Sequence, residues 1–495
     1  MRNLFILCLM CGTFLLNAQN SAIPSKVQLE ANLRFLASDA LQGRRTGSAG
    51  NQIAGEFIAT FFEGLGLIAP VDAPEYKQMV PLEEKVPPME ASFTIDDISY
   101  DFGEDFIILS GKEGELEAPI VFAGHGWINE EGTHNDYEGL DVSGKIVLVL
   151  PGPPDVQDPN QIFRAMGWKK KLAAERGAVG LIELYRMQFP WPFFKRYFGR
   201  PSISFSDGEE TTDAEQNLIY GWLKEKEPIQ LDQFESNAIL QSSGTYAEKL
   251  ETFNVIGIIE GSDPELKEEY MLLTAHYDHV GMGKNGGGAF TEEDSIFNGA
   301  RDNGMGTIAL MAAAHSFAIS PPKRSVIILA VTGEEIGLLG SQYYADNPLV
   351  PLDQTVFNLN TDGAGYNDIT TISMIGFGRT GTDEELKEGA ASAGLTIIPN
   401  PSEEQGLFDR SDNVSFARLG VPAITLSPGF EAFDEEIRKY YHQVTDEADS
   451  VDFDYLYLYC KAFEKAARNI ANRSTRPFWL PGDKYENAGK ALYGN

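Results

Sequence analysis

The sequence predicts an α/β fold with a mostly parallel central sheet, helices on both faces and an inserted β-rich domain. Three apolar, β-branched runs support the parallel sheet: MLLTA before His276, SVIILAVTG before Glu334 and TVFNLN before Asp362. Such runs are typical of strands that are buried on both sides. Functional groups gather at the carboxyl ends of strands in open α/β sheets. We therefore expect these three polar residues to lie together in the fold.

Helical segments fit before and between these strands. VQLEANLRFLA and NQIAGEFIATFFEGLGL predict two amphipathic helices on either side of the loop GRRTGSAG, and the second should end near Gly64. GMGTIALMAAAHSFAI predicts a further helix. TDEELKEGAASAGL predicts another, opened by a capping box of Thr382 and Glu385.

The domain organisation follows from length and from changes in pattern. A chain of 495 residues is too long for one hydrophobic core. Short strands such as APIVFAGHG, KIVLVLPG and GAVGLIELY, separated by turn-rich stretches, indicate an inserted domain. We predict a signal peptide at 1–18, a helical part of the main domain at 24–83, an inserted domain at 84–244, a catalytic domain at 245–475 and a C-terminal extension at 476–495.

The N-terminus has the build of a secretory signal peptide. It has a basic start, an apolar stretch from Leu4 to Leu16 and a small residue, Ala18, before a polar continuation. The apolar stretch is too short to span a membrane stably, and an uncleaved anchor is the alternative. We therefore expect an exported protein, periplasmic or secreted, without stable membrane insertion.

Charge limits the possible binding partners, and cysteine content limits the possible disulfides. The formal net charge of −34 argues against nucleic acid or an anionic membrane as a partner. Only Cys460 would remain after cleavage, so the mature chain would have no internal disulfide. Its place in an apparently helical segment predicts a buried structural thiol. The sequence does not define an oligomeric state.

Acidic and imidazole side chains form a candidate metal site. They are His276, Asp302, Glu334, Glu335, Asp362 and His442. Oxygen and imidazole ligands without thiolate fit catalytic rather than structural zinc. Two zinc ions would balance three carboxylates and a bridging hydroxide, whereas without cations the carboxylates would repel one another. Asp278 lies two positions after the first histidine, and we expect its carboxylate to hold the other imidazole nitrogen.

This set of residues predicts hydrolysis of an acyl bond. Paired zinc ions lower the pKa of a bound water and polarise a carbonyl group. Of the adjacent pair Glu334 and Glu335, one can bind metal while the other transfers protons. The chain contains no G-x-S-x-G elbow and no H-E-x-x-H motif, which argues against the common serine hydrolases and single-zinc proteases.

Six segments resemble the successive motifs of metallopeptidase family 28, the co-catalytic zinc aminopeptidases that also include glutamate carboxypeptidase II. They are HYDHVG, NGARDNGMGT, TGEEIGLLGS, NLNTDGAG, RSDNVSFARLGVPAI and YYHQVTDEADS. LASDALQGRRTGSAG is similar to the family's usual lead-in, and the inserted domain resembles a protease-associated (PA) domain. The resemblance implies the zinc exopeptidase fold, a sheet with helices on both faces.

The resemblance also implies a role for each site residue. One zinc would bind His276 and Asp362, the other would bind Glu335 and His442, Asp302 would bridge them, and Glu334 would be the general base. Tyr441 matches a tyrosine that helps to hold the oxyanion in several members, and Arg410 matches an arginine that some members use near the substrate carbonyl. The chain departs from the family where Arg301 precedes Asp302, because the family motif often has an acid there.

We expect an exported, zinc-dependent aminopeptidase that hydrolyses N-terminal residues from peptides, with two Zn²⁺ per chain. A carboxypeptidase of the glutamate carboxypeptidase type is the closest alternative, and it would need a basic cluster for the substrate carboxylate. Glutaminyl cyclase, which has a related fold, uses one zinc ion, and a non-catalytic relative would have lost ligands. The remaining histidines have no carboxylate pattern that completes a site, and His279 is expected at the rim.

Overall fold

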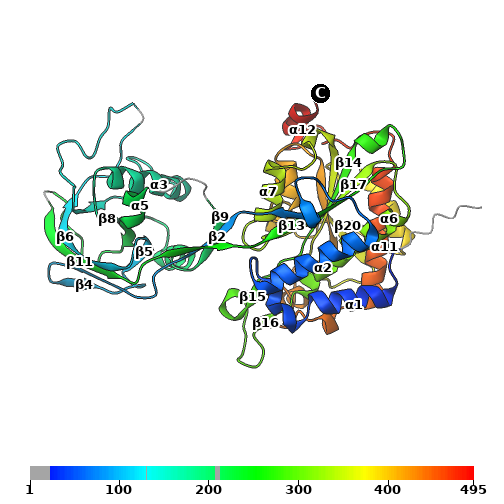
Figure 1. Cartoon of the computed structure of the whole chain (residues 1–495), viewed down its shortest axis with the longest axis horizontal. Helices are drawn as coiled ribbons and strands as arrows, with labels where there is room; N and C mark the ends of the chain where they lie inside the picture. Colours follow the sequence, from blue (N-terminus) through cyan, green and yellow to red (C-terminus); the bar gives the residue numbers. More distant parts are fainter. Residues whose placement is uncertain (1–22, 130, 207–211, 233, 495) are drawn as a thin grey trace, which may run out of the picture. The chain divides into compact units, whose positions relative to one another are not determined.

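The computed structural model describes residues 23–129, 131–206, 212–232 and 234–494 (Figure 1). The chain forms two compact units, a first unit of Met1–Val80 with Thr252–Asn495 and a second unit of Pro81–Glu251. The second unit is a little wider than the predicted inserted range 84–244. The predicted signal peptide at 1–18 lies outside the described residues. None of the helices in the described ranges is long and apolar enough to cross a lipid bilayer.

The first unit contains an eight-stranded sheet with a parallel centre, as predicted. Its strands, in spatial order, are β1 (Lys77–Met79), β13 (Phe253–Ile259), β17 (Ser325–Val331), β14 (Tyr270–His276), β18 (Thr355–Thr361), β21 (Ala423–Pro428), β19 (Thr371–Ile375) and β20 (Thr396–Pro399). The four strands from β17 to β21 are mutually parallel. Antiparallel pairs occur toward the edges, where β13 meets β17, β1 meets β13 and β19 meets β21.

Helices cover both faces of this sheet, which also agrees with the prediction (Figure 1). Their bounds are α1 Lys26–Leu36, α2 Ala49–Leu65, α6 Met305–Ile319, α7 Leu339–Asp346, α8 Asp383–Ser392, α9 Asn413–Ala417, α10 Glu435–Arg438, α11 Phe453–Ala471 and α12 Glu486–Tyr493. Alternate residues of a strand point to opposite faces. In β14, Met271 and Leu273 therefore pack in the larger core with α1, α2, α6 and α11, whereas Leu272 packs in the core with α7 and α9.

The predicted helices form, with one difference in detail. Helix α2 ends before Gly66, whose φ of 72° is the left-handed conformation that terminates helices. Helix α8 forms where predicted, but its capping box does not. The Thr382 hydroxyl lies 2.8 Å from that of Thr380, and Glu385 accepts a hydrogen bond from Arg473 at 2.8 Å. A local partner, Thr380, and a tertiary partner, Arg473, therefore replace the predicted pair.

The predicted C-terminal extension, 476–495, belongs to the first unit as far as it is described. Trp479 is buried, and its Nε1 donates to the Gly420 carbonyl at 3.0 Å. Arg379 donates to Asp483 at 2.6 Å. Cys460 is fully buried in α11, as expected of a structural thiol.

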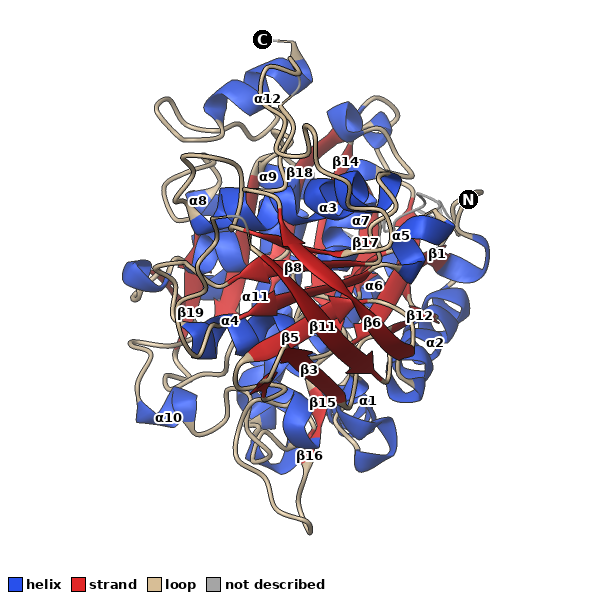
Figure 2. Cartoon of the chain, turned by 90° about the vertical axis from the view of Figure 1, so that its left-hand side faces the viewer, coloured by secondary structure: helices blue, strands red, loops and turns tan. Residues whose placement is uncertain are grey.

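The second unit has its own eight-stranded sheet, whose strands β3, β5, β6, β8 and β11 are labelled in Figure 2. In spatial order the strands are β4 (Ile98–Tyr100), β3 (Ala91–Ile95), β11 (Glu235–Ser242), β6 (Gly114–Phe122), β7 (Ile146–Val149), β8 (Gly180–Leu184), β10 (Ile219–Leu223) and β5 (Phe106–Ser110). A smaller sheet contains β12 (Tyr246–Leu250), β2 (Leu82–Val86) and β9 (Ser202–Phe205), and the helices are α3 (Pro159–Glu175), α4 (Trp191–Phe198) and α5 (Asp213–Asn217). The resemblance to a PA domain stays a prediction.

The two connections to the second unit start side by side. In the first unit, Met79 of β1 is the register partner of Phe253 of β13, and the Val80 amide donates to the Thr252 carbonyl at 3.0 Å. In the second unit, β2 and β12 pair antiparallel, with Leu82 opposite Leu250. The chain therefore leaves and re-enters the first unit at neighbouring positions.

Candidate metal centre

Adjacent parallel strands bring the predicted site residues to one edge of the sheet. His276 is the last residue of β14, and Asp362 directly follows β18. Glu334 and Glu335 follow β17 after the short link Thr332–Gly333. Because β17, β14 and β18 are parallel neighbours, with His276 opposite Val331, their carboxyl ends meet.

Seven side chains converge there in two groups. One group is His279, Asp302, Glu335 and His442, and the other is His276, Glu334 and Asp362; within each group the possible ligand atoms lie within 4.8 Å of one another. Asp302 connects the two groups. Its Oδ1 lies 3.5 Å from His276 Nε2, and its Oδ2 lies 3.3 Å from His442 Nε2. This is the arrangement expected of a bridging carboxylate.

In the group of His276, the imidazole lies between two acids. Its Nε2 is 3.1 Å from Asp362 Oδ1, while Asp362 Oδ2 accepts a hydrogen bond from Ser411. Its Nδ1 is 3.2 Å from the backbone carbonyl of Asp278 and 3.7 Å from the carboxylate of the same residue. The prediction assigned this nitrogen to the carboxylate. The carbonyl is closer because the carboxylate accepts hydrogen bonds elsewhere, from Thr46 at 2.9 Å and from the Glu334 amide at 3.2 Å.

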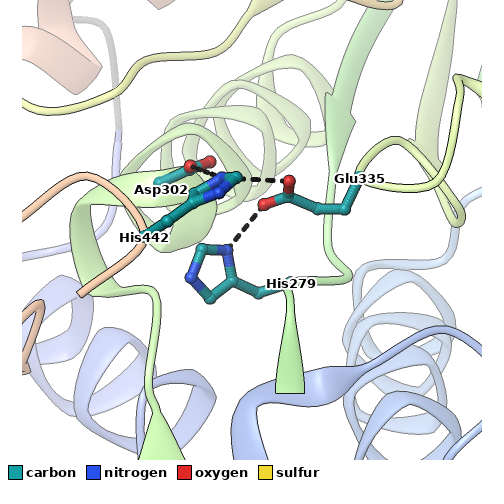
Figure 3. Close-up of side chains that lie close together, drawn as sticks. All are labelled: His279, Asp302, Glu335 and His442. Carbon is teal, nitrogen blue, oxygen red and sulfur yellow. Dashed lines mark hydrogen bonds and ion pairs between the residues drawn. The ribbon is translucent and has the colours of Figure 1, made fainter. Parts of the chain in front are cut away.

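In the other group, Glu335 lies between two histidines (Figure 3). Its Oε2 is 3.1 Å from His442 Nε2, and its Oε1 is 2.8 Å from His279 Nδ1. His279 is 1% exposed, so the expectation that it lines the rim is wrong. The two histidines of HYDH lie on different sides of the centre, which the motif alone does not reveal.

Asp302 lies in the distorted helical turn Ala300–Gly304, and Asp446 joins this turn to the loop that carries His442. The Asp446 carboxylate accepts the backbone amides of Arg301 at 2.9 Å and of Asp302 at 3.1 Å. His442 itself has a left-handed backbone, with φ of 54°. The side chain of Arg301, the departure from the family motif, is held by the Ser450 carbonyl at 2.5 Å and stacks on the Tyr440 ring at 3.6 Å. It is therefore held by groups outside the ligand set.

The electrostatics of the centre favour bound cations. Burial alone would raise the pKa of Asp302, but its hydrogen bonds with His276 and His442 outweigh burial and lower it. Burial also opposes the shift of Glu335, yet His279 and His442 hold its pKa at about 2. In return, Asp302 and Glu335 raise the pKa of His442 to about 10 against the effect of burial. Without a metal ion, protons on the imidazoles would offset the carboxylate charge. Bound cations would displace these protons, because a metal ion binds neutral imidazole. Imidazole with carboxylate is the donor set of catalytic zinc.

Glu334 differs from its neighbour Glu335. Burial raises its pKa well above the usual value, and the charges of Asp362 and Glu335 add to the increase against the opposing effect of His276. Two adjacent carboxyl groups with pKa values shifted in opposite directions are typical of separate chemical roles.

A pocket of about 90 Å³ opens onto both groups. Its apolar wall includes Ile375, Leu407, Phe430, Phe433 and Ile437. Arg410 and Tyr441 also line it, with Arg410 Nη2 3.5 Å from Tyr441 Oη. Tyr441 packs against a metal-site residue, since its ring centroid lies 4.1 Å from that of His442. Among the described residues that line the pocket, Arg410 is the only arginine or lysine.

Comparisons with known proteins agree with this geometry. Residues 254–463 match the sequence model of Peptidase family M28. The chain is 31% identical over 162 residues to a vacuolar membrane protease of Saccharomyces cerevisiae, and 31% identical over 134 residues to the vacuolar membrane protease of Lachancea thermotolerans. These alignments cover 33% and 27% of this chain but only 14% and 12% of the two relatives.

The overall fold is similar to that of a solved aminopeptidase from Aneurinibacillus sp. strain AM-1. The likeness has a TM-score of 0.52 and 19% sequence identity, and it covers 94% of this chain and 98% of that one. It supports the α/β fold. The segment that matches the model of Peptidase family M28, residues 254–463, contains the carboxyl ends of β14, β17 and β18, where the candidate ligands lie.

Proposed function

We propose that the protein is a metallo-exopeptidase that removes N-terminal residues from peptides and holds two zinc ions per chain. The observation that carries this proposal is the meeting of two donor groups at Asp302, whose carboxylate oxygens face His276 and His442. A carboxylate with one oxygen on each side suits a pair of cations. The match of residues 254–463 to the model of Peptidase family M28 supports peptide-bond hydrolysis.

Each zinc ion would have its own donors besides the shared Asp302. His276 and Asp362 would hold one ion, and Glu335 and His442 would hold the other. When bound, paired zinc ions activate a water molecule and polarise a carbonyl group. Cobalt or manganese could bind the same nitrogen and oxygen donors in vitro.

Glu334 would act as the proton carrier. It would accept the proton of the attacking water and deliver it to the leaving amine. Its place in the pocket wall, beside Glu335 but with an oppositely shifted pKa, supports this role. Asp278 would orient it, because the Asp278 carboxylate accepts the Glu334 backbone amide.

Tyr441 and Arg410 would bind the substrate carbonyl. The Tyr441 hydroxyl would donate a hydrogen bond to the carbonyl oxygen, where negative charge develops during the reaction. Burial raises the pKa of Tyr441 well above its usual value, so the hydroxyl keeps its proton at neutral pH. Arg410 lies within reach of that hydroxyl and would add positive charge.

The charge of the pocket favours an aminopeptidase over a carboxypeptidase. A substrate carboxylate needs a cluster of cationic side chains, whereas the pocket lining contributes Arg410 alone among the described arginines and lysines. A free amine instead needs acidic partners, and the acids Glu334, Glu335 and Asp362 all line the pocket. Two donor groups also argue against glutaminyl cyclase, which uses one zinc ion.

We also propose that the protein is exported, to a periplasmic or secreted location, on the strength of the basic and apolar pattern of residues 1–18. N-terminal sequencing of the protein recovered outside the cytoplasm would test this. Cleavage near Ala18 is the expected result, and an intact N-terminus in the cytoplasmic fraction would contradict it.

Metal analysis combined with a substrate panel tests the enzymatic proposal. The purified protein should hold two zinc ions and release the chromophore from amino-acid anilides with a free amine. N-acetylated anilides serve as the matched control and should not be cleaved, because they lack the amine that the carboxylates attract. Cleavage of N-blocked peptides from the C-terminus would support a carboxypeptidase instead. A protein without bound divalent metal would refute the proposal.

A further inference from the structure

Arg44 is a buried cation that carries no role in the proposed reaction. It lies in the loop GRRTGSAG and is 1% exposed. Its guanidinium donates four hydrogen bonds to backbone carbonyls. They are Nε to Tyr277 at 2.8 Å, Nη1 to Leu36 at 2.5 Å and to Asn298 at 2.6 Å, and Nη2 to Gly299 at 2.9 Å. A planar guanidinium carries five donors in a fixed fork, whereas an ammonium carries only three on a flexible stem and cannot satisfy four acceptors.

Three of these carbonyls belong to the segments that carry metal-site residues. Tyr277 lies between His276 and Asp278. Asn298 and Gly299 come just before Asp302, the carboxylate between the two donor groups. One side chain therefore joins the segment of the first histidine to the segment of the shared aspartate.

The backbone next to Arg44 lies between the same two segments. A Cβ added to Gly43, whose φ is 69°, would lie 2.2 Å from the Gly281 carbonyl oxygen and 2.6 Å from that of Phe297. The Arg44 carbonyl in turn accepts the backbone amide of His279 at 3.2 Å. Arg44 itself has a φ of 50°, an uncommon backbone for a residue with a side chain. Contacts on both sides hold this conformation in place.

The charge of Arg44 also suits its surroundings. Burial lowers its pKa to about 10, with Asp446, Asp278 and Asp302 acting in the opposite direction. The guanidinium therefore remains charged at neutral pH. It supplies a permanent positive charge behind a cluster of carboxylates, while its hydrogen bonds go to backbone carbonyls and leave the carboxylate oxygens for other partners.

We propose that Arg44 is a positioning residue for the metal centre, which sets the spacing between the His276 and Asp302 segments so that the two donor groups can share a pair of cations. This inference rests on the metal-binding part of the proposed function. Loss of the guanidinium would let the two segments move apart. Zinc affinity should then fall by more than the loss of folding stability alone would cause.

Arg324 offers a matched control in the same unit. It is also 1% exposed and also binds backbone carbonyls, those of Ala471 and Arg473, together with the Glu269 carboxylate at 2.7 Å. It precedes β17, at the end of that strand opposite to the carboxyl end that leads to Glu334. An Arg324→Lys change should thus disturb a comparable buried network without reaching the metal centre.

The test compares zinc affinity and melting temperature in the wild-type chain, Arg44→Lys and Arg324→Lys. Zinc affinity is measured by competition with a chelator. Arg44→Lys should bind zinc about tenfold to a hundredfold more weakly, the range found for residues that orient metal ligands. Arg324→Lys should lower the melting temperature but keep the wild-type zinc affinity. Wild-type affinity in Arg44→Lys, or an equal loss in Arg324→Lys, would overturn the inference.

Two further measurements, zinc binding by the wild-type chain and hydrogen exchange, separate this inference from the proposed function. A wild-type protein that binds no zinc would refute the proposed function itself, whereas a zinc-loaded wild type with an unaffected Arg44→Lys refutes only the role of Arg44. If Arg44→Lys does not fold, hydrogen exchange of the wild-type chain replaces it. Zinc should slow amide exchange in residues 41–46 together with 276–279 and 298–303, and unchanged exchange in 41–46 would overturn the inference.

Discussion

Each unit of the molecule buries a cluster of charged side chains, and the two clusters differ in how their charges are matched. In the second unit, Lys169 and Glu183 are both fully buried and form an ion pair. Lys169 also donates to the Leu150 carbonyl at 2.7 Å, and Tyr220 donates to Glu183 at 2.6 Å. In the first unit, the carboxylates of the metal centre gather around histidines and face a pocket.

A functional site and a structural network differ in whether protein partners balance the buried charge. The pair in the second unit is neutral as a whole, and its polar atoms are occupied by protein partners. The metal centre has several carboxyl groups whose charges only protons or cations can balance. Burial of ionisable groups therefore does not mark a functional site by itself. A functional site is marked instead by buried charge that no protein partner balances and that faces a pocket.

Removal of metal should produce the largest contrast between the clusters. A chelator should abolish hydrolysis of amino-acid anilides, because water activation and carbonyl polarisation both depend on the cations. Calorimetry of the same sample should show a lower melting temperature for the first unit and an unchanged transition for the second. Added zinc should restore both activity and stability. Full activity after exhaustive chelation would contradict the metal dependence.

Replacement of Glu334 should give the next largest effect. Glu334→Gln removes the proton carrier but keeps the shape of the side chain, so kcat should fall about 10²- to 10⁴-fold. The zinc content should stay at the wild-type value, because Glu334 is assigned to protons and not to metal. A Glu335→Gln variant is the comparison, and it should lose zinc. Loss of zinc in Glu334→Gln would instead make it a ligand.

Breaking the pair in the second unit should change stability and not catalysis. Lys169→Met leaves Glu183 buried without its cation, which should destabilise the second unit by about 3–5 kcal/mol. Urea unfolding measures this loss, and zinc content and peptidase activity should be unaffected. The double variant Lys169→Met with Glu183→Gln should recover part of the stability. An activity loss in the single variant that exceeds its unfolded fraction would link the two clusters.

Asp412 should give the smallest effect, visible as a pH dependence of the metal-free protein. Burial raises its pKa from 3.8 to about 7. The folded state therefore binds a proton more tightly than the unfolded state, so this contribution to stability is complete below about pH 4 and is lost as the pH rises to 7. Asp412→Asn has no proton to lose. In metal-free samples, the free energy of unfolding of Asp412→Asn should therefore decline by about 2–4 kcal/mol less than that of the wild type over this pH range. Parallel pH curves for both proteins in urea unfolding would contradict the assignment.

The sequence predicted those parts of the fold that depend on local pattern. The apolar runs before His276, Glu334 and Asp362 predicted β14, β17 and β18, because a strand buried on both faces needs apolar residues at every position. Neighbouring parallel strands then brought the polar residues that follow them to one edge. The strand pattern was therefore enough to place these candidate ligands together.

Residues whose roles depend on long-range contacts could not be predicted in the same way. His279 lies beyond the end of β14, where strand periodicity no longer indicates direction, and its contact with Glu335 exists only in the folded chain. Thr382 and Glu385 matched a local capping motif, but in the folded chain Glu385 binds the distant Arg473 instead. The loop of Arg44 was predicted as a link between helices, and three of the four carbonyls that its side chain binds come from distant segments.

The pairing of Met79 with Phe253 makes the second unit detachable in principle. Because Val80 and Thr252 are hydrogen-bonded neighbours, a tight turn could join them directly and convert β1 and β13 into an ordinary hairpin. The pairing of β13 with β17 would be preserved. The edge of the sheet where the candidate ligands lie would therefore also be preserved. Excision or exchange of the whole insertion would then amount to the replacement of one surface loop, the kind of change that folded proteins tolerate best.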